Sequence, residues 1–98
     1  MALVSTSIKA DDIITLMTSE GELIAKFVSE SDSVIQVKSP LQVSGTSSVA
    51  DTGQTKALWG KISTTSSSTD VVDLNSNNIL CVLLTDEAIA TQYSTEVS

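Results

Sequence analysis

The side chains that could do chemistry in this chain lack the partners that catalysis requires. Serine and threonine are abundant, but there is no histidine to act as their base, so that only carboxylates could take that part. The sequence also holds no glycine-rich phosphate loop and no cluster of cysteine and histidine with metal-ligand spacing. A small hydrolase that uses Asp or Glu has no motif behind it. The sequence therefore predicts a protein that is not an enzyme and that has no catalytic residues, cofactor or metal.

Two smaller features favour structural explanations. Cys81 is the single cysteine, which excludes an intrachain disulfide, and it lies within an apolar run where a small buried thiol is expected. Asp11 and Asp12 precede another apolar run, where an acidic pair suits a cap or a turn better than a metal site.

Lys56, Trp59 and Lys61 have the composition of a ligand site. An aromatic ring flanked by lysines can stack a nucleic-acid base and hold a phosphate. The tryptophan can instead pack an arm of the chain onto a neighbouring subunit, and we favour this interpretation.

The charge of the chain argues against nucleic acids and membranes as partners. The formal net charge is -7, and the five lysines are scattered along the chain rather than gathered in a basic stripe. Because phosphate neutralisation supplies most of the affinity of nucleic-acid binders, RNA is disfavoured and DNA is not expected. Anionic membrane surfaces are disfavoured for the same reason.

The expected location is the cytoplasm. No stretch has the pattern of a signal peptide or approaches the roughly 20 apolar residues of a membrane span. An acidic composition rich in serine and threonine is also typical of phage-like or marine microbial products, which keeps association with a virion as an alternative.

The chain is expected to form one all-β domain, because 98 residues leave no room for a second core. Three short apolar runs rich in β-branched residues predict consecutive antiparallel strands at Ile13–Thr18, Glu22–Ser29 and Val34–Val37. Pro40 then either bends the third strand or places it at an edge of the sheet.

The rest of the chain is expected to frame and complete this sheet. Residues 1-12 are a lead-in, either a short helical turn or a loose tail. Segment 44-78 is rich in serine and threonine, and we expect an insertion that pairs in part as an extended hairpin arm. The most apolar run, Ile79–Leu84, predicts a central strand. Ala88–Tyr93 is then either a last short strand or a helical turn.

This order of elements resembles the Sm-like fold, the small bent barrel of Sm and LSm proteins and of bacterial Hfq. The first motif of that family, an alternating strand that ends at a glycine, is similar to Ile14–Gly21. Ala25 stands where the second strand of the family has a small residue at its bend, and the family's aspartate turn and apolar strand resemble Asp32–Val37. The second motif, a strand, a sharp turn and a last short strand, resembles Ile79–Leu84, Thr85-Asp86 and Ala88–Ala90.

The resemblance implies a strongly bent, five-stranded antiparallel barrel with a long hairpin-like insertion between strands three and four. It also implies a homo-oligomeric ring, since the last two strands of neighbouring subunits in this family pair edge to edge and close about five to seven copies into a torus. The interface residues that it implies are Ile79, Leu80, Val82, Leu84 and Ile89.

The residues with which members of this family bind RNA are replaced here. Ser33 to Ile35 stand where the family has an asparagine, and Thr85-Asp86 stand where it has an Arg-Gly or Lys-His pair. A ring of repeated Asp86 and Glu87 carboxylates would repel phosphate. We therefore expect a non-enzymatic assembly, structural or adaptor module. The alternative is a divergent Sm-like RNA-binding protein that uses the surface around Trp59.

Overall fold

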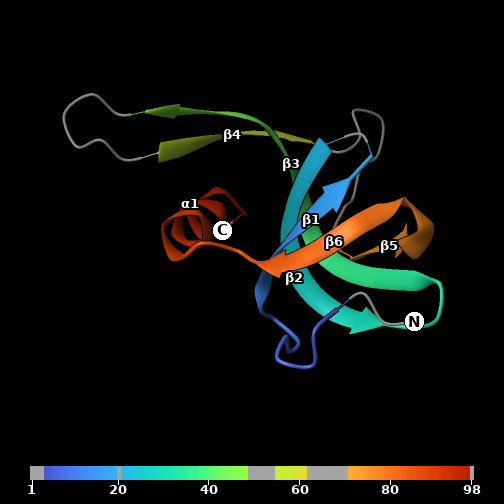
Figure 1. Cartoon of the computed structure of the whole chain (residues 1–98). Helices are drawn as coiled ribbons and strands as arrows, with labels where there is room; N and C mark the ends of the chain where they lie inside the picture. The colour runs from blue at the N-terminus through green and yellow to red at the C-terminus, as the bar shows by residue number, and fades with distance from the viewer. Residues whose placement is uncertain (1–3, 20, 49–54, 62–70, 98) are drawn as a thin grey trace.

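An antiparallel sheet forms the body of the computed structural model, which describes residues 4-19, 21-48, 55-61 and 71-97 (Figure 1). The strands pair in the order β4-β3-β2-β1-β6, and β5 is added to β3. The described part of the chain is therefore an open six-stranded sheet with one α-helix. The elements are β1 (Ile13–Thr18), β2 (Gly21–Glu30), β3 (Val34–Ser48), β4 (Thr55–Lys61), β5 (Val71–Asn75), the 3-10 helix η1 (Ser76–Asn78), β6 (Ile79–Leu84) and α1 (Glu87–Val97).

The three strands predicted for the first half of the chain are present, but β3 continues from its predicted end at Val37 to Ser48. β1 has the predicted bounds, and Ile14 and Leu16, which share one of its faces, are fully buried. β2 exceeds its predicted bounds by one residue at each end, because Gly21 pairs with β1 and Glu30 pairs with β3. The alternation of apolar residues was enough to place both strands.

The second half departs from the prediction of five strands in an all-β chain. Segment 44-78, expected as an insertion, contributes the additional strand β5. The last element is a helix, and it includes the whole of Ala88–Tyr93. The carboxylate of Asp86 starts this helix, since its Oδ2 accepts a hydrogen bond of 3.2 Å from the backbone N–H of Ala88, as an N-cap residue does.

The long strand β3 has two halves with different partners. Val34 to Lys38 pair with β5 along one edge, and the half that begins at Leu41 pairs with β4 along the same edge. Beyond Val43, β3 no longer pairs with β2 and pairs only with β4. These parts of β3 and β4 form a hairpin that projects from the body of the sheet (Figure 1). Residues 44-48 and 55-58 thus form an arm of the expected kind, whereas the tract Ser63–Thr69 lies outside the described residues.

A β-bulge joins the two halves of β3. The pairing register between β2 and β3 shifts here, so that Ser39 and Pro40 both oppose Ala25. Ser39 takes the left-handed region, with φ of 51°. Pro40, which has no N–H to donate, lies in the gap between the residues that pair with β5 and those that pair with β4. Of the two alternatives that Pro40 left open, the bend is the one observed, and the small, fully buried Ala25 lies opposite it.

Tyr93 attaches helix α1 to this bulge. Its side chain is fully buried, and its hydroxyl donates to the carbonyl oxygen of Ser39 at 2.6 Å, with the carbonyl oxygen of Lys38 at 3.2 Å. The ring also meets Trp59 of β4 edge to face, with centroids 6.0 Å apart and planes at 65°. The helix therefore supplies a donor to the carbonyl of Ser39, a bulge residue with no register partner on the neighbouring strands.

A second contact from the same helix reaches the backbone of β4. The side-chain Oε1 of Gln92 accepts a hydrogen bond of 2.9 Å from the N–H of Ala57. Helix α1 is thus attached to β4 by two contacts, the hydrogen bond between Gln92 and Ala57 and the edge-to-face packing of Tyr93 on Trp59.

Residues 4-12 of the lead-in pack on the sheet and do not form a loose tail. Val4 and Ile8 are buried in the main apolar cluster. The N–H of Phe27 donates to the carbonyl of Asp12 at 2.8 Å, and the carbonyl of Phe27 accepts from the N–H of Asp11 at the same distance. Asp12 Oδ2 accepts from the N–H of Lys9 at 2.9 Å, which is the turn role expected of this acidic pair.

We expect Tyr93→Phe to lower the free energy of unfolding by about 1–2 kcal/mol, because the partly buried carbonyl of Ser39 loses its donor while the ring packing is kept. Urea denaturation followed by circular dichroism measures the change. Ser94→Ala is the matched control, since Ser94 is an exposed neighbour on the same helix and should change stability by less than about 0.5 kcal/mol. Equal stability of Tyr93→Phe and the unmodified chain would contradict the role given to this hydroxyl.

The same tyrosine predicts a loss of stability in alkali. Burial raises the pKa of Tyr93 from 10.0 to about 12, against a smaller opposing effect of a backbone hydrogen bond with Lys26. The unfolded chain therefore releases this proton first, so the stabilisation is complete below pH 10 and is lost as the pH rises toward 12, by at most about 3 kcal/mol. The free energies of unfolding of the unmodified chain and of Tyr93→Phe should converge as the pH rises from about 10 to about 12. Parallel pH curves for the two chains would contradict the prediction.

Candidate functional site

The described part of the chain does not gather chemistry-bearing side chains into a reactive centre. Within the described ranges, no three residues of the His, Cys, Asp and Glu types lie close enough together to hold a metal ion. Cys81 is half-buried on β6 rather than fully enclosed. Asp11 and Asp12 belong to the turn before β1.

The proposed stacking group around Trp59 is only partly assembled. Trp59 is half-buried and its ring contacts Tyr93 of the chain's own helix, so it packs the arm within one subunit. Lys56 is exposed three residues away, which places it on the opposite face of the strand. Lys61 is the last residue of β4, and its side chain lies outside the described part of the structure. Lys56 and Trp59 therefore cannot hold the same nucleotide in this conformation.

The positions aligned with RNA-binding residues of Sm-like proteins have structural contacts here. The carbonyl of Ser33 accepts from the N–H of Ser76 at 3.0 Å, and Ile35 is fully buried. The Thr85 hydroxyl forms a 2.9 Å hydrogen bond with that of Thr15. Asp86 caps helix α1. These contacts give each position a role in the fold of the single chain.

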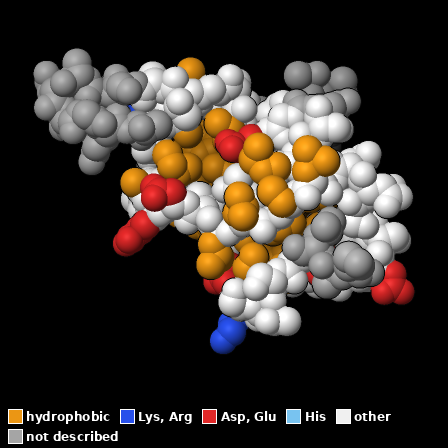
Figure 2. Space-filling view, in the orientation of Figure 1, with side chains coloured by type: hydrophobic (Ala, Val, Ile, Leu, Met, Phe, Trp, Pro, Cys, Tyr) orange, Lys and Arg blue, Asp and Glu red, His pale blue; other side chains and the backbone are white. Residues whose placement is uncertain are grey.

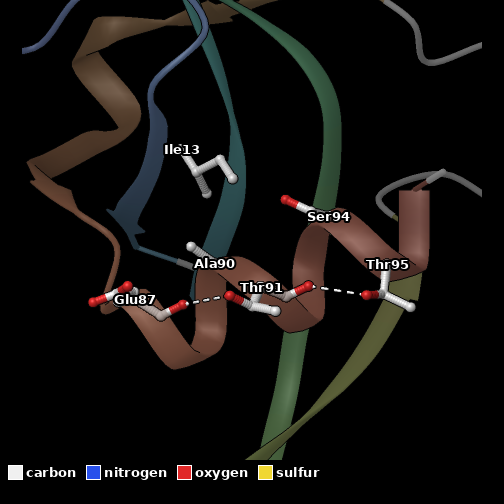
Figure 3. Close-up of a pocket in the computed structure, with 6 residues that line it drawn as sticks. All are labelled: Ile13, Glu87, Ala90, Thr91, Ser94 and Thr95. Carbon is white, nitrogen blue, oxygen red and sulfur yellow. Dashed lines mark hydrogen bonds between the residues drawn. The ribbon is translucent and has the colours of Figure 1, made fainter.

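Helix α1 and the start of β1 border an open groove of about 470 Å³ (Figure 3). Ile13 and Ala90 supply its apolar surface, and Glu87 is the one ionisable residue among those that line it. The Thr91 hydroxyl on its wall donates to the carbonyl of Glu87 at 3.0 Å, so this group is engaged within the helix. A smaller hollow of about 220 Å³ lies between the β1–β2 turn and η1, with Leu23, Leu74 and Ile79 among its lining residues. Neither hollow brings together an acid and a base.

The most distinctive surface is the edge of β6. The prediction that Ile79–Leu84 is a central strand is wrong, because among the described strands β6 pairs with β1 alone and its other edge has no strand beside it. Leu80, Leu83 and Leu84 are exposed by 69%, 52% and 57%. Figure 2 shows hydrophobic side chains gathered across the face that carries β6 and α1. We call Leu80, Leu83 and Leu84 the leucine edge.

The residues predicted for the interface divide into two groups. Ile79 and Val82 are buried in the core of the chain itself, so they are not available to a partner, whereas Leu80 and Leu84 are exposed. Ile89 is half-buried on α1. Leu83 was not among the predicted interface residues. A register shift against β1 at Leu80 breaks the alternation of faces along β6. The sequence of this run alone therefore does not predict which of its side chains are exposed.

Comparisons with protein-family models, with curated proteins and with solved structures give no match. No helix in the described ranges is long and apolar enough to cross a membrane. The physical features of the chain therefore carry the functional argument.

We expect oligouridine and oligoadenine to leave the fluorescence of Trp59 unchanged at low and at physiological salt. The ring is engaged by Tyr93, and Lys56 lies on the opposite face of the strand. Trp59 is the only tryptophan, so the emission reports this position alone. Quenching that weakens as salt is added would indicate base stacking with phosphate contacts and would support the RNA-binding alternative.

Proposed function

We propose that this chain is a non-enzymatic module that assembles with copies of itself through the leucine edge and serves as a structural or adaptor component. The exposure of the leucine edge along an unpaired strand is the observation that carries the proposal. An edge strand offers a row of backbone donors and acceptors, and natural proteins usually blunt such an edge with charges or proline. β6 contains neither.

Energetic reasoning favours association at this strand. Covering one exposed leucine contributes about 1.5–3 kcal/mol in the limit of full burial. Three leucines on one short strand can therefore offset a good part of the cost of bringing two chains together. The net charge of -7 opposes association elsewhere on the surface, so the uncharged edge is the favoured point of contact.

We infer an Sm-like course of the strands within the single chain. Its support is the sequence of a glycine turn after β1, a bulge opposite Ala25 and a bent third strand. Ala88–Ala90 cannot be the last strand of the second Sm motif, because it is helical. We assign the strand, turn and strand of that motif to β5, η1 and β6 instead. The ring implied by the resemblance would need the edge of β6 to meet the edge of β5 in the next copy, and this head-to-tail contact is the alternative to the two-fold pairing proposed below.

Self-assembly predicts that Leu84→Lys and Leu80→Lys each raise the dissociation constant of the oligomer at least about tenfold, because a buried leucine is replaced by a charge that must be desolvated. Light scattering coupled to size exclusion, over a range of protein concentrations, measures the effect. Leu58→Lys is the matched control, since Leu58 is 47% exposed on β4, away from β6. An unmodified chain that stays monomeric at micromolar concentrations would refute the proposal.

A further inference from the structure

The backbone groups available at the free edge of β6 can be assigned from its contact with β1. The N–H of Thr85 donates to the carbonyl of Ile13 at 3.1 Å. Hydrogen bonding alternates along an antiparallel pair, so Leu83 and Cys81 also direct their backbone groups to β1. Leu84 and Val82 then direct theirs away from β1. Leu80 is the extra residue of the bulge and has no partner position on β1.

The exposed leucines lie on both faces of this strand. Leu84 stands opposite Ile14, whose side chain points into the core, and Leu83 stands opposite Thr15 on the other face. A partner that packed against one face of the sheet would leave one of these two leucines in water. A strand added to the edge of β6 would cover both, which favours continuation of the sheet.

The described strands differ in how well they could supply that added strand. β5 exposes Val71, Asp73 and Asn75, so the leucines would meet a carboxylate and an amide. The N–H of Ala57 on β4 is already bound by Gln92. β6 has no charged or amide side chain along its whole length. The best match for the leucine edge is therefore the leucine edge of a second copy.

We propose that two copies pair their β6 strands antiparallel about a two-fold axis, with Val82 opposite Val82. This inference rests on the proposed self-assembly and names its geometry. Only residues with outward backbone groups can form the hydrogen-bonded pairs of the new ladder. Centring the axis on Val82 satisfies this condition, and it also sets Leu80 opposite Leu84. Cys81 then faces Leu83 as a pair without hydrogen bonds between them.

The acidic residues after β6 are compatible with this pairing. In this register Asp86, which follows β6, lies toward the η1 end of the other copy, where Ser76 to Asn78 carry no charge. The two Asp86 carboxylates are separated by roughly 27 Å, at about 3.4 Å for each of eight residues. That distance is well beyond the Debye length of about 8 Å at physiological salt. Two-fold pairing therefore keeps the like charges next to the strand apart.

Such an interface is isologous and closes at two copies, unlike the head-to-tail contact of a ring. Disulfide trapping separates the two arrangements. In the two-fold register the Cα atoms of Cys81 and of residue 83 in the other copy lie about 4.5 Å apart, within the range of disulfides. Mild oxidation of Leu83→Cys should therefore give a covalent dimer and no larger species on a non-reducing gel.

Two further variants serve as controls, each with the native Cys81. Leu58→Cys places an exposed thiol on β4 and measures cross-linking by random collision. Asp73→Cys places a thiol in the middle of β5, where a head-to-tail contact would give a ladder of oligomers. A dimer from Leu83→Cys alone supports the two-fold pairing. A ladder from Asp73→Cys without a dimer from Leu83→Cys overturns it and leaves self-assembly standing.

The unmodified chain supplies a test that needs no substitution. Two-fold pairing predicts a particle of two copies, in which the Val82 and Leu84 amides are protected from hydrogen exchange and lose that protection on dilution. The amides of Cys81 and Leu83 should stay protected at every concentration, because they face β1. A particle of two copies with unprotected Val82 and Leu84 amides overturns the strand pairing, and a monomer overturns the proposed function as well.

Discussion

The bulge that sets Ser39 and Pro40 opposite Ala25 is the constraint on which the rest of the structure depends. It allows β3 to leave β5 and take β4 as its neighbour, so that one strand serves both the body and the arm. It also turns backbone carbonyls away from the ladder, and these require a donor. Tyr93 supplies the donor, and thereby fixes where the helix and Trp59 lie. The partial burial of the tryptophan is thus a consequence of a backbone irregularity.

Local patterns predicted the elements whose stability is local. Alternating apolar residues gave β1 with its bounds, and Pro40 with Ala25 marked the bend. β5 was not predicted, because its exposed Val71, Asp73 and Asn75 resemble a turn region. Its extended form comes from pairing with Val34 to Lys38, a contact remote in sequence.

The end of the chain shows a second limit of sequence reasoning. Capping residues and alanine favoured a helix, while the family pattern favoured a strand. The helix places Tyr93 against the bulge of β3 and Gln92 against Ala57 of β4. These are tertiary contacts, which the local sequence does not encode. The leucine edge was predicted only in part. The family resemblance implied Leu80 and Leu84, whereas the exposure of Leu83 depends on a register shift that only the pairing with β1 defines.

The hydrogen bond from Ala57 to Gln92 bears on how far any assembly can extend. A sheet with two open ends can recruit further chains without limit, which is the geometry of fibrils. Here one end of the strand order is β6, and the other, β4, lies under helix α1. The C-terminal helix therefore occupies the β4 end of the strand order, and the edges left for another chain are those of β6 and of β5, which carries exposed Asp73 and Asn75. An acidic protein with an apolar edge can in this way form a finite particle instead of a polymer.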